Sequence, residues 1–244
     1  MTRPQAQAET LKHALLDAGA EVLAVPGLEI FPAQNNKLET AFLDLDRFQH
    51  VIFTSINAAR LGMEKLDEYW PQWPVGVKWY AVGAATAKVL AEYIVQAQLP
   101  EKYNSEGLLA LPSLQCLTEQ KVLIVKGVGG RTLLADTLKA RGAELVLADV
   151  YRRACPPVNT RMQAQVEMVL NTGSPLVMVV SSIETLENLE TLLAPSWLQL
   201  QKKPLVVVSE RIAQHAKLKG FQNISVSPKP DDASVITTLG ALFA

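Results

Sequence analysis

The amino-acid sequence predicts an α/β fold in which parallel sheets are divided between two lobes. The first observation is a repeat: Gly19-Ala20-Glu21-Val22 returns 123 residues later as Gly142-Ala143-Glu144-Leu145. Two more landmarks repeat in the same order, Phe53-Thr54-Ser55-Ile56 as Val180-Ser181-Ser182-Ile183 and Ala81-Val82-Gly83 as Val207-Val208-Ser209, 127 and 126 residues later. The second observation is that short apolar runs alternate with segments of helical length. A duplicated chain of this kind forms two lobes, and therefore a cleft.

The strands are predicted from short apolar runs rich in β-branched residues. These runs are Val51–Phe53, Trp79–Val82, Val122–Val125, Leu145–Val150, Val177–Val180 and Leu205–Val208. Each is followed by a polar or glycine turn and then a segment with helical periodicity, which is typical of a parallel sheet covered by helices on both faces. Before Gly19 and Gly142, leucines recur at helical spacing, so each glycine is expected to end a helix in the left-handed conformation.

Two proline-bearing segments, Pro26–Pro32 and Tyr151–Pro157, follow the second strand of each copy. We expect the chain to cross between the lobes at these points, and two narrow crossings side by side would form a hinge. The expected lobe 1 is residues 1–30 with 157–244, and lobe 2 is residues 35–150. Residues 31–34 and 151–156 are the expected linker strands.

Composition narrows the possible function classes. The 244 residues include 23 Lys and Arg against 24 Asp and Glu, and the basic residues are scattered, so no nucleic-acid partner is expected. No apolar run reaches the roughly 18 residues of a membrane span and no signal region is seen, so we expect a cytoplasmic protein without a membrane partner. The two cysteines and three histidines lack metal-ligand spacing, and no nucleophile motif is present, so neither a metal nor a covalent nucleophile is expected.

Candidate binding residues stand where the predicted strands end. In an open parallel sheet, ligands bind at the carboxyl ends of the strands, where helix N-termini expose N–H groups. The residues at those ends are small, hydroxylated or glycine, with one lysine: Thr54, Ser55, Gly83, Thr86, Lys126, Gly127, Ser181, Ser182 and Ser209. Such an edge suits an anionic ligand held by backbone amides.

The alternative interpretation of these residues is structural. Serine and threonine at the start of a helix are ordinary N-caps, and Ser181 with Glu184 fits the capping box. Arg131 is expected to open a helix, where a cation opposes the helix dipole, and this conflict favours a functional role. The glycines from Gly127 to Gly130 lack the spacing of a dinucleotide or P-loop fingerprint, so we interpret the turn as a nest of backbone amides for an anion.

Taken together, these segments resemble the uroporphyrinogen-III synthase family over nearly the whole chain. The resemblance rests on seven pieces in order: Thr2-Arg3-Pro4, Phe53 to Ala58, Val82 to Ala87, Ser105 to Leu109, Lys126 to Arg131, Arg141 to Ala143 leading to Val150-Tyr151-Arg152, and Ser181-Ser182. It implies two flavodoxin-like lobes with parallel sheets, joined by a two-strand linker. It also implies a cofactor-free reaction on hydroxymethylbilane, a linear tetrapyrrole that loses water, inverts its terminal D ring and closes to the macrocycle.

The resemblance also implies roles for individual residues. Tyr151 is the residue expected to assist departure of the hydroxyl group. Ser55, Thr86, Ser105 and Ser182 are expected to donate hydrogen bonds to the substrate, and Arg3, Lys126 and Arg131 are its expected charged contacts. The remaining substrate contacts are the strand-end residues named above. We expect a monomer that makes transient contact with the enzyme supplying hydroxymethylbilane.

The sequence departs from the family pattern in two places. Ile212 stands where the pattern prefers threonine, which weakens a ligand role for the turn from Ser209 to Ile212. The first strand is also nearly absent, because only Met1 and Thr2 precede Arg3 where the second copy has Lys121–Val125. Either the natural start lies upstream or the lobe tolerates a frayed strand.

Two other function classes stay open on the residues alone. One is a non-catalytic, two-lobed binding protein for an anionic metabolite, since a fold does not fix a function. The other is a nucleotide-dependent transferase that uses the turn at Gly127. Turnover of hydroxymethylbilane separates the first from an enzyme, and protection from unfolding by a nucleotide tests the second.

Overall fold

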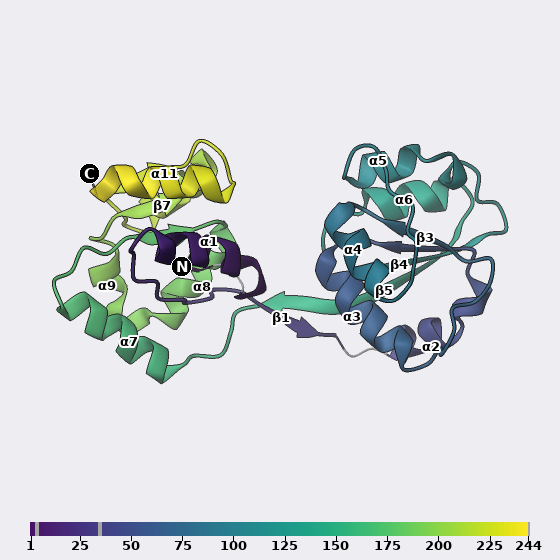
Figure 1. The fold of residues 1–244 in the computed structure, drawn as a ribbon, viewed down its shortest axis with the longest axis horizontal. Coiled ribbons are helices and arrows are strands. Elements are labelled where there is room, and N and C mark those ends of the chain that lie inside the picture. Colours follow the sequence, from purple (N-terminus) through teal and green to yellow (C-terminus); the bar gives the residue numbers. More distant parts are fainter. Residues whose placement is uncertain (3–4, 34–35, 244) are drawn as a thin grey trace. The chain divides into compact units, whose positions relative to one another are not determined.

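The chain divides into two compact units (Figure 1). The computed structural model describes residues 1–2, 5–33 and 36–243. Unit 1 contains Met1–Glu29 and Ala154–Ala244, and unit 2 contains Ile30–Arg153. The chain enters unit 2 in strand β1 (Glu29–Pro32) and leaves it at the end of β5 (Glu144–Ala154), and these two strands are neighbours in one sheet.

Unit 2 is built on a five-stranded sheet in the order β1-β5-β4-β2-β3. Strands β2 (His50–Phe53), β3 (Lys78–Ala81) and β4 (Lys121–Gly127) are parallel, and β4 also pairs in parallel with β5. The carboxyl ends of β2, β3, β4 and β5 therefore meet at one edge, which we call the carboxyl edge of unit 2. The apolar runs that predicted these strands lie within them, apart from Val82, which follows β3.

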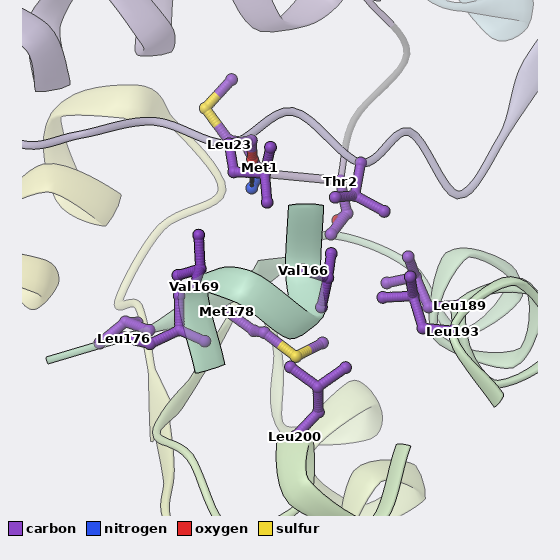
Figure 2. Close-up of a pocket in the computed structure, with 12 residues that line it drawn as sticks. Met1, Thr2, Leu23, Val166, Val169, Leu176, Met178, Leu189, Leu193 and Leu200 are labelled. Carbon is purple, nitrogen blue, oxygen red and sulfur yellow. Dashed lines mark hydrogen bonds between the residues drawn. The ribbon is translucent and has the colours of Figure 1, made fainter. Parts of the chain in front are cut away.

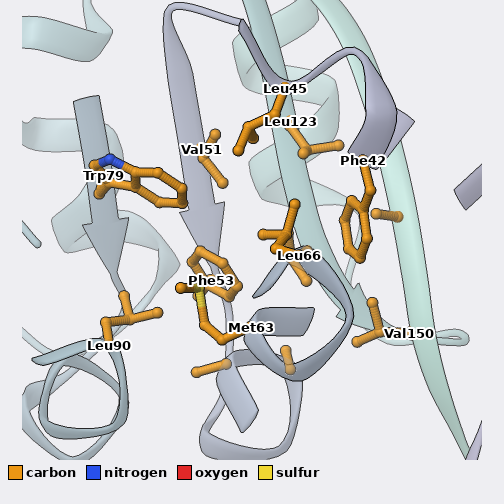
Figure 3. Packing of buried hydrophobic residues seen from close by; sticks show 14 of the residues in the cluster. Phe42, Leu45, Val51, Phe53, Met63, Leu66, Trp79, Leu90, Leu123 and Val150 are labelled. Atoms are coloured by element: carbon orange, nitrogen blue, oxygen red, sulfur yellow. The ribbon is translucent and has the colours of Figure 1, made fainter. Parts of the chain in front are cut away.

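Helices cover both faces of this sheet because its side chains alternate between two apolar clusters. Val51 and Phe53 pack with α2 (Asn36–Leu43), α3 (Ile56–Asp67) and α4 (Ala84–Glu92), as Figure 3 shows around Phe53 and Met63. Ile52 packs on the other side with α5 (Ser105–Ala110) and α6 (Leu133–Ala140). Short 3-10 turns at Leu45–Arg47 and Pro112–Leu114 complete the unit. Each large side chain buried in this way stabilises the fold by roughly 1.5–3 kcal/mol.

Unit 1 repeats this architecture on a parallel sheet in the order β6-β7-β8. Its strands are β6 (Met178–Val180), β7 (Leu205–Val207) and β8 (Ile224–Val226). One face packs against α7 (Thr160–Asn171), α8 (Ile183–Leu192), the turn Ala194–Ser196, α9 (Trp197–Leu200) and α10 (Glu210–Leu218); the other packs against α1 (Gln5–Asp17) and α11 (Asp232–Phe243). Among the described helices, none is both long and apolar enough to cross a membrane.

The short first strand expected from the sequence is present as a stub. The backbone N–H groups of Val25 and Gly27 donate to the carbonyl oxygens of Met1 and Thr2 at 2.7 and 3.1 Å. The Met1 amine donates to the Leu23 oxygen at 2.7 Å, and Thr2 Oγ1 donates to the Val179 oxygen of β6. Residues 1–2 thus lie between residues 23–27 and β6. They correspond to β4 of unit 2, which lies between β5 and β2.

An apolar cavity of about 50 Å³ lies beside this stub (Figure 2). The cavity is lined by residues 1–2, by Leu23 and Val25 of the adjacent segment, and by side chains of α7, β6 and α8, such as Val166, Met178 and Leu189. The Met1 amine is deeply buried next to it, and burial lowers the pKa of this amine to about 6. Both features mark a place where the core of unit 1 is incompletely filled.

An engineered apolar extension is expected to stabilise unit 1. Adding Val-Leu-Ile before Thr2, after the pattern of Val122–Ile124, replaces the buried amine by a hydrogen-bonded amide and supplies apolar side chains to the core. The amine is more protonated in the unfolded chain between pH 6 and 8, so the free energy of unfolding rises with pH in that window, by about 1.4 kcal/mol per pKa unit. The extension should raise the melting temperature most near pH 6 and remove this part of the pH dependence.

The matched control is an extension of equal length with the polar sequence Ser-Asn-Gln. It removes the amine without adding apolar side chains, so it should lose the pH dependence and gain less in melting temperature. His50, whose pKa is also lowered chiefly by burial, gives all three proteins a common rise in stability with pH. An apolar extension that melts no higher than the polar one would show that the sheet is complete as it stands.

Candidate active site

Ser55 lies at the carboxyl edge of unit 2, two residues after the end of β2. Its extended backbone, with φ −164°, makes it the N-cap of α3, and its Oγ accepts the Ala58 N–H at 3.1 Å. Neighbouring Thr54 is turned toward β4, where its Oγ1 donates to the Val125 oxygen at 3.3 Å. The structural interpretation of Ser55 as a cap is therefore confirmed, and the cap also has a second partner.

That second partner is Tyr151, whose Oη lies 3.2 Å from Ser55 Oγ. Tyr151 reaches this position because the register of β4 and β5 shifts: Lys126 pairs with Asp149, but Gly127 pairs with Tyr151. The extra residue, Val150, is a β-bulge, a feature that redirects the side chains next to it. Only 4% of Tyr151 is exposed, so its phenol is held in a fixed orientation at the N-terminus of α3.

Gly127 is the residue that leaves room for the Tyr151 ring. A Cβ atom on Gly127 would lie 2.5 Å from Tyr151 Cζ, which is closer than side-chain atoms approach. The backbone N–H of Val128 donates to the backbone carbonyl oxygen of Tyr151 at 2.7 Å, which fixes the main chain just after the bulge. The structure shows that the Tyr151 ring packs directly on Gly127, and the predicted substrate contact of Gly127 stays a prediction.

Lys126 is engaged inside unit 2. Its Nζ lies 3.2 Å from Asp149 Oδ1 and donates to the Gly129 oxygen at 2.7 Å, and only 19% of its side chain is exposed. Gly129 and Gly130 have φ of +77° and +88°, so the turn after β4 uses glycine where other residues would be strained. The lysine therefore holds the turn in place, besides being an expected charged contact.

Arg131 is paired with a carboxylate across the carboxyl edge. Its Nη1 lies 3.5 Å from Glu106 Oε1, and both side chains are more than half exposed. The prediction that Arg131 opens a helix was wrong by two residues, because α6 starts at Leu133 after its N-cap Thr132. An exposed pair of this kind contributes at most about 1 kcal/mol, so a ligand carboxylate can replace Glu106 at low cost.

Gly83 and Thr86 follow the end of β3, and Ser105 comes two residues after Tyr103, which packs against Gly83. Gly83 is the N-cap of α4 and has no side chain to cap it, and Thr86 is buried in the first turn of that helix. Ser105 is the first residue of α5, whose N-cap is Asn104. The backbone N–H groups in the first turn of α4 therefore have no side-chain acceptor at Gly83.

Unit 1 has its own carboxyl edge, lined by Ser181, Ser182 and Ser209. Ser182 is the N-cap of α8, since its Oγ accepts the Thr185 N–H at 3.0 Å and donates to Thr185 Oγ1 at 2.8 Å. The capping box predicted for Ser181 and Glu184 was therefore wrong by one residue. Ser209 caps α10 through a longer bond of 3.4 Å to the Ile212 N–H. Arg3, the remaining predicted contact, lies outside the described residues.

The two copies differ at the position of the phenol. At the offset of 123 residues, Leu28 is the counterpart of Tyr151, and it is a buried hydrophobic residue of unit 1. The hydroxyl pair of Ser55 and Tyr151 is thus a feature of unit 2.

Within the described ranges, no group of three or more His, Cys, Asp or Glu side chains is placed to hold a metal ion.

Comparison with known proteins decides the family. A family model described as "Uroporphyrinogen-III synthase HemD" matches residues 9–237. The chain belongs to the uroporphyrinogen-III synthase family. Two curated relatives of this name, from Salmonella typhimurium and Escherichia coli, are each 31% identical to it, over 250 and 245 residues, and each alignment covers 98% of this chain and 98% of the relative.

Solved structures of uroporphyrinogen-III synthases share the fold. A mutant synthase from Thermus thermophilus aligns with a TM-score of 0.54 at 16% identity, covering 100% of this chain and 99% of that one. The synthetase from Helicobacter pylori aligns with a TM-score of 0.58 at 16% identity, covering 91% of this chain and 94% of that one. The predicted fold class, α/β with parallel sheets in two lobes, is thereby confirmed.

Three residues of the carboxyl edge of unit 2 were missed by the sequence analysis. Asp149 and Glu106 bind the two cations of the edge, and Tyr103 lies against Gly83. The residues named at the strand ends in the sequence analysis include no carboxylate, whereas this edge carries Asp149 and Glu106. Asp149 stands inside an apolar strand, where a charged residue is unusual, and this was the available signal. The sequence offered no comparable signal for Glu106 or Tyr103.

Proposed function

We propose that this protein is a uroporphyrinogen-III synthase, an enzyme of heme biosynthesis that cyclises hydroxymethylbilane to uroporphyrinogen III. The reaction releases water and inverts the D ring, so the class is a cyclising lyase. Family membership over nearly the whole chain supports the assignment. The observation that carries the chemistry is the Tyr151 phenol, held by Ser55 at the N-terminus of α3.

Helix N-termini and a few cations supply the attraction for the carboxylates of the substrate. Each helix N-terminus contributes about 0.3–1 kcal/mol toward an anion, and more where water is excluded. In unit 2 these groups are the first turn of α4 after Gly83, with Thr86, the turn at Gly127, and the side chains of Lys126 and Arg131. Thr54, Ser55, Ser105, Ser181, Ser182, Ser209 and Arg3 complete the proposed contacts. A protein of net charge −1 can thus bind a polyanion without a basic patch.

Tyr151 assists the departure of the hydroxyl group in this proposal. Ser55 Oγ already accepts the Ala58 N–H, and its own proton can be donated to Tyr151 Oη. The phenol proton is then free for the leaving hydroxyl, so that the C–O bond breaks, water departs and the pyrrole nitrogen stabilises the cation left behind. This cation first bonds to the D-ring carbon that already carries the methylene bridge, which has no proton to lose, so a spiro intermediate forms. The bond from that carbon to the bridge then breaks, and the bridge, now a pyrrole-stabilised cation, bonds to the unsubstituted α-carbon of the D ring. That carbon loses its proton, the D ring is inverted, and the proton restores the phenol.

Positioning accounts for the remaining rate enhancement and for the choice of isomer. Closure without inversion needs no enzyme, so the protein must favour the folded conformer in which the D ring turns. Fixed backbone N–H groups suit this task, because they hold carboxylates without a strong acid or base near the reactive pyrroles.

The test is conversion of freshly prepared hydroxymethylbilane by the purified chain. We expect type III isomer after oxidation and chromatographic separation, without added metal or organic cofactor. A non-catalytic binding protein would retain a tetrapyrrole but leave only the type I isomer. Type I product alone at high protein concentration would contradict the proposed function.

A further inference from the structure

Tyr103 presents an exposed aromatic ring at the carboxyl edge of unit 2. It is 62% exposed, whereas Tyr80 and Tyr151 of the same unit are buried. The base of the side chain is nevertheless fixed, because it packs against the backbone of Gly83. A Cβ atom on Gly83 would lie 3.3 Å from Tyr103 Cβ and 3.5 Å from Cγ. The ring is therefore held at its root while much of its surface faces solvent.

The segment that carries Tyr103 is held on both sides. Asn104 caps α5 by accepting the Gly107 N–H at 2.7 Å, and its own N–H donates to the Lys102 oxygen at 2.8 Å. Gly107 has no room for a side chain, because a Cβ atom there would collide with the Lys102 oxygen. A ring on such a turn loses little further freedom when a ligand packs on it, which favours binding.

The exposed ring lies next to the N-terminus of helix α4. Gly83, on which Tyr103 rests, is the N-cap of α4, and it provides no side-chain hydrogen bond to the first turn. Thr132, the N-cap of α6, likewise makes no side-chain hydrogen bond to its helix, whereas side chains cap the helices that follow Ser55, Asn104, Ser182 and Ser209. An aromatic surface thus lies beside helix N–H groups that lack a side-chain acceptor.

We propose that the Tyr103 ring is a platform on which one pyrrole ring of hydroxymethylbilane stacks, with a carboxylate of that pyrrole directed to the N-terminus of α4. This inference rests on the proposed function and names a positioning residue for it. A pyrrole of this substrate is flat and electron-rich and carries acidic side chains, so it matches an aromatic face next to N–H donors. Stacked and edge-to-face arrangements are both favourable for such rings.

The experiment compares steady-state kinetics of type III formation by the wild type, Tyr103→Leu and Tyr103→Phe. Tyr103→Leu keeps an apolar side chain but removes the aromatic face, so KM should rise roughly fivefold, as expected for one stacked aromatic pair. The ring is expected to stabilise the bound substrate and the transition state equally, so kcat should change by less than about twofold. Tyr103→Phe keeps the face and should leave both constants near the wild-type values.

The matched control is Phe243→Leu, which removes an exposed aromatic ring at the last residue of α11 and should leave KM unchanged. Melting temperatures equal to wild type show that the variants are folded. An unchanged KM in Tyr103→Leu, or an equal loss in Tyr103→Phe, would overturn the platform while the enzyme stays active. A wild type that forms no type III isomer contradicts the proposed function itself, and the platform with it.

Discussion

Tyr151→Phe is expected to lower kcat for type III formation by at least tenfold, which corresponds to about 1.4 kcal/mol of transition-state stabilisation. The substitution removes only the hydroxyl group that meets Ser55 Oγ at 3.2 Å, and the ring keeps its place on Gly127. One lost hydrogen bond costs about 0.5–1.5 kcal/mol, so the melting temperature should fall by no more than about 6 °C. Steady-state kinetics and thermal unfolding of the same preparation measure both effects.

Tyr80→Phe provides a control with the same chemical change elsewhere in unit 2. The Tyr80 hydroxyl contacts His50 Nδ1 at 2.9 Å and donates to Ser113 Oγ at 3.0 Å, and His50 begins β2 at the end opposite Ser55. This variant should lose stability and keep its kcat. If the kcat of Tyr151→Phe equals that of the wild type, the Tyr151 hydroxyl has no part in the reaction and the residue only packs the core.

Gly127→Ala is expected to reduce stability and turnover together. The new methyl group would lie 2.5 Å from Tyr151 Cζ, so the ring must move away from Ser55 or the β-bulge must open. Overpacking of this kind costs about 1–3 kcal/mol, and displacement of the phenol should remove most of the activity that Tyr151 provides. Thermal unfolding and kcat report the two effects separately.

A double-mutant cycle with Tyr151→Leu tests the cause. Leucine lacks the ring atoms that an alanine side chain at position 127 would meet, so Gly127→Ala should cost less stability in that background. Gly129→Ala is the local control: its Cβ would meet no atom within 4 Å, and only its φ of +77° opposes the change. Equal costs of Gly127→Ala in both backgrounds would show that the turn, and not Tyr151, requires glycine.

Local sequence patterns predicted the regular elements well. Apolar runs located β2 to β7 to within a few residues at each end, and leucine spacing with a terminal glycine located the ends of α1 and α6. Gly19 and Gly142 have φ of +82° and +92°, which confirms the left-handed caps. β8 was missed because Ile224-Ser225-Val226 is too short and too polar at its centre to be distinguished from a loop.

The parts of the site that escaped prediction depend on pairing between distant segments. No local pattern shows that β5 carries an extra residue opposite Lys126 and Gly127, yet this bulge brings Tyr151 to Ser55. The ion pair of Arg131 and Glu106 likewise joins the segment before α6 to the start of α5. Candidate residues could therefore be named from the sequence, but their partners depend on the register of the sheet.

The division of the chain between the units has a consequence for biosynthesis. Unit 2 is one continuous stretch, Ile30–Arg153, so it can be completed while the ribosome is still translating the C-terminal part of unit 1. Unit 1 needs both ends of the chain, and until Ala154–Ala244 emerges, the nascent segment Met1–Glu29 has no sheet to join. Apolar side chains of that segment, such as Leu11 and Val25, stay exposed throughout this interval. The nascent chain is therefore most prone to aggregate, and most dependent on chaperones, before the C-terminal part of unit 1 has been synthesised.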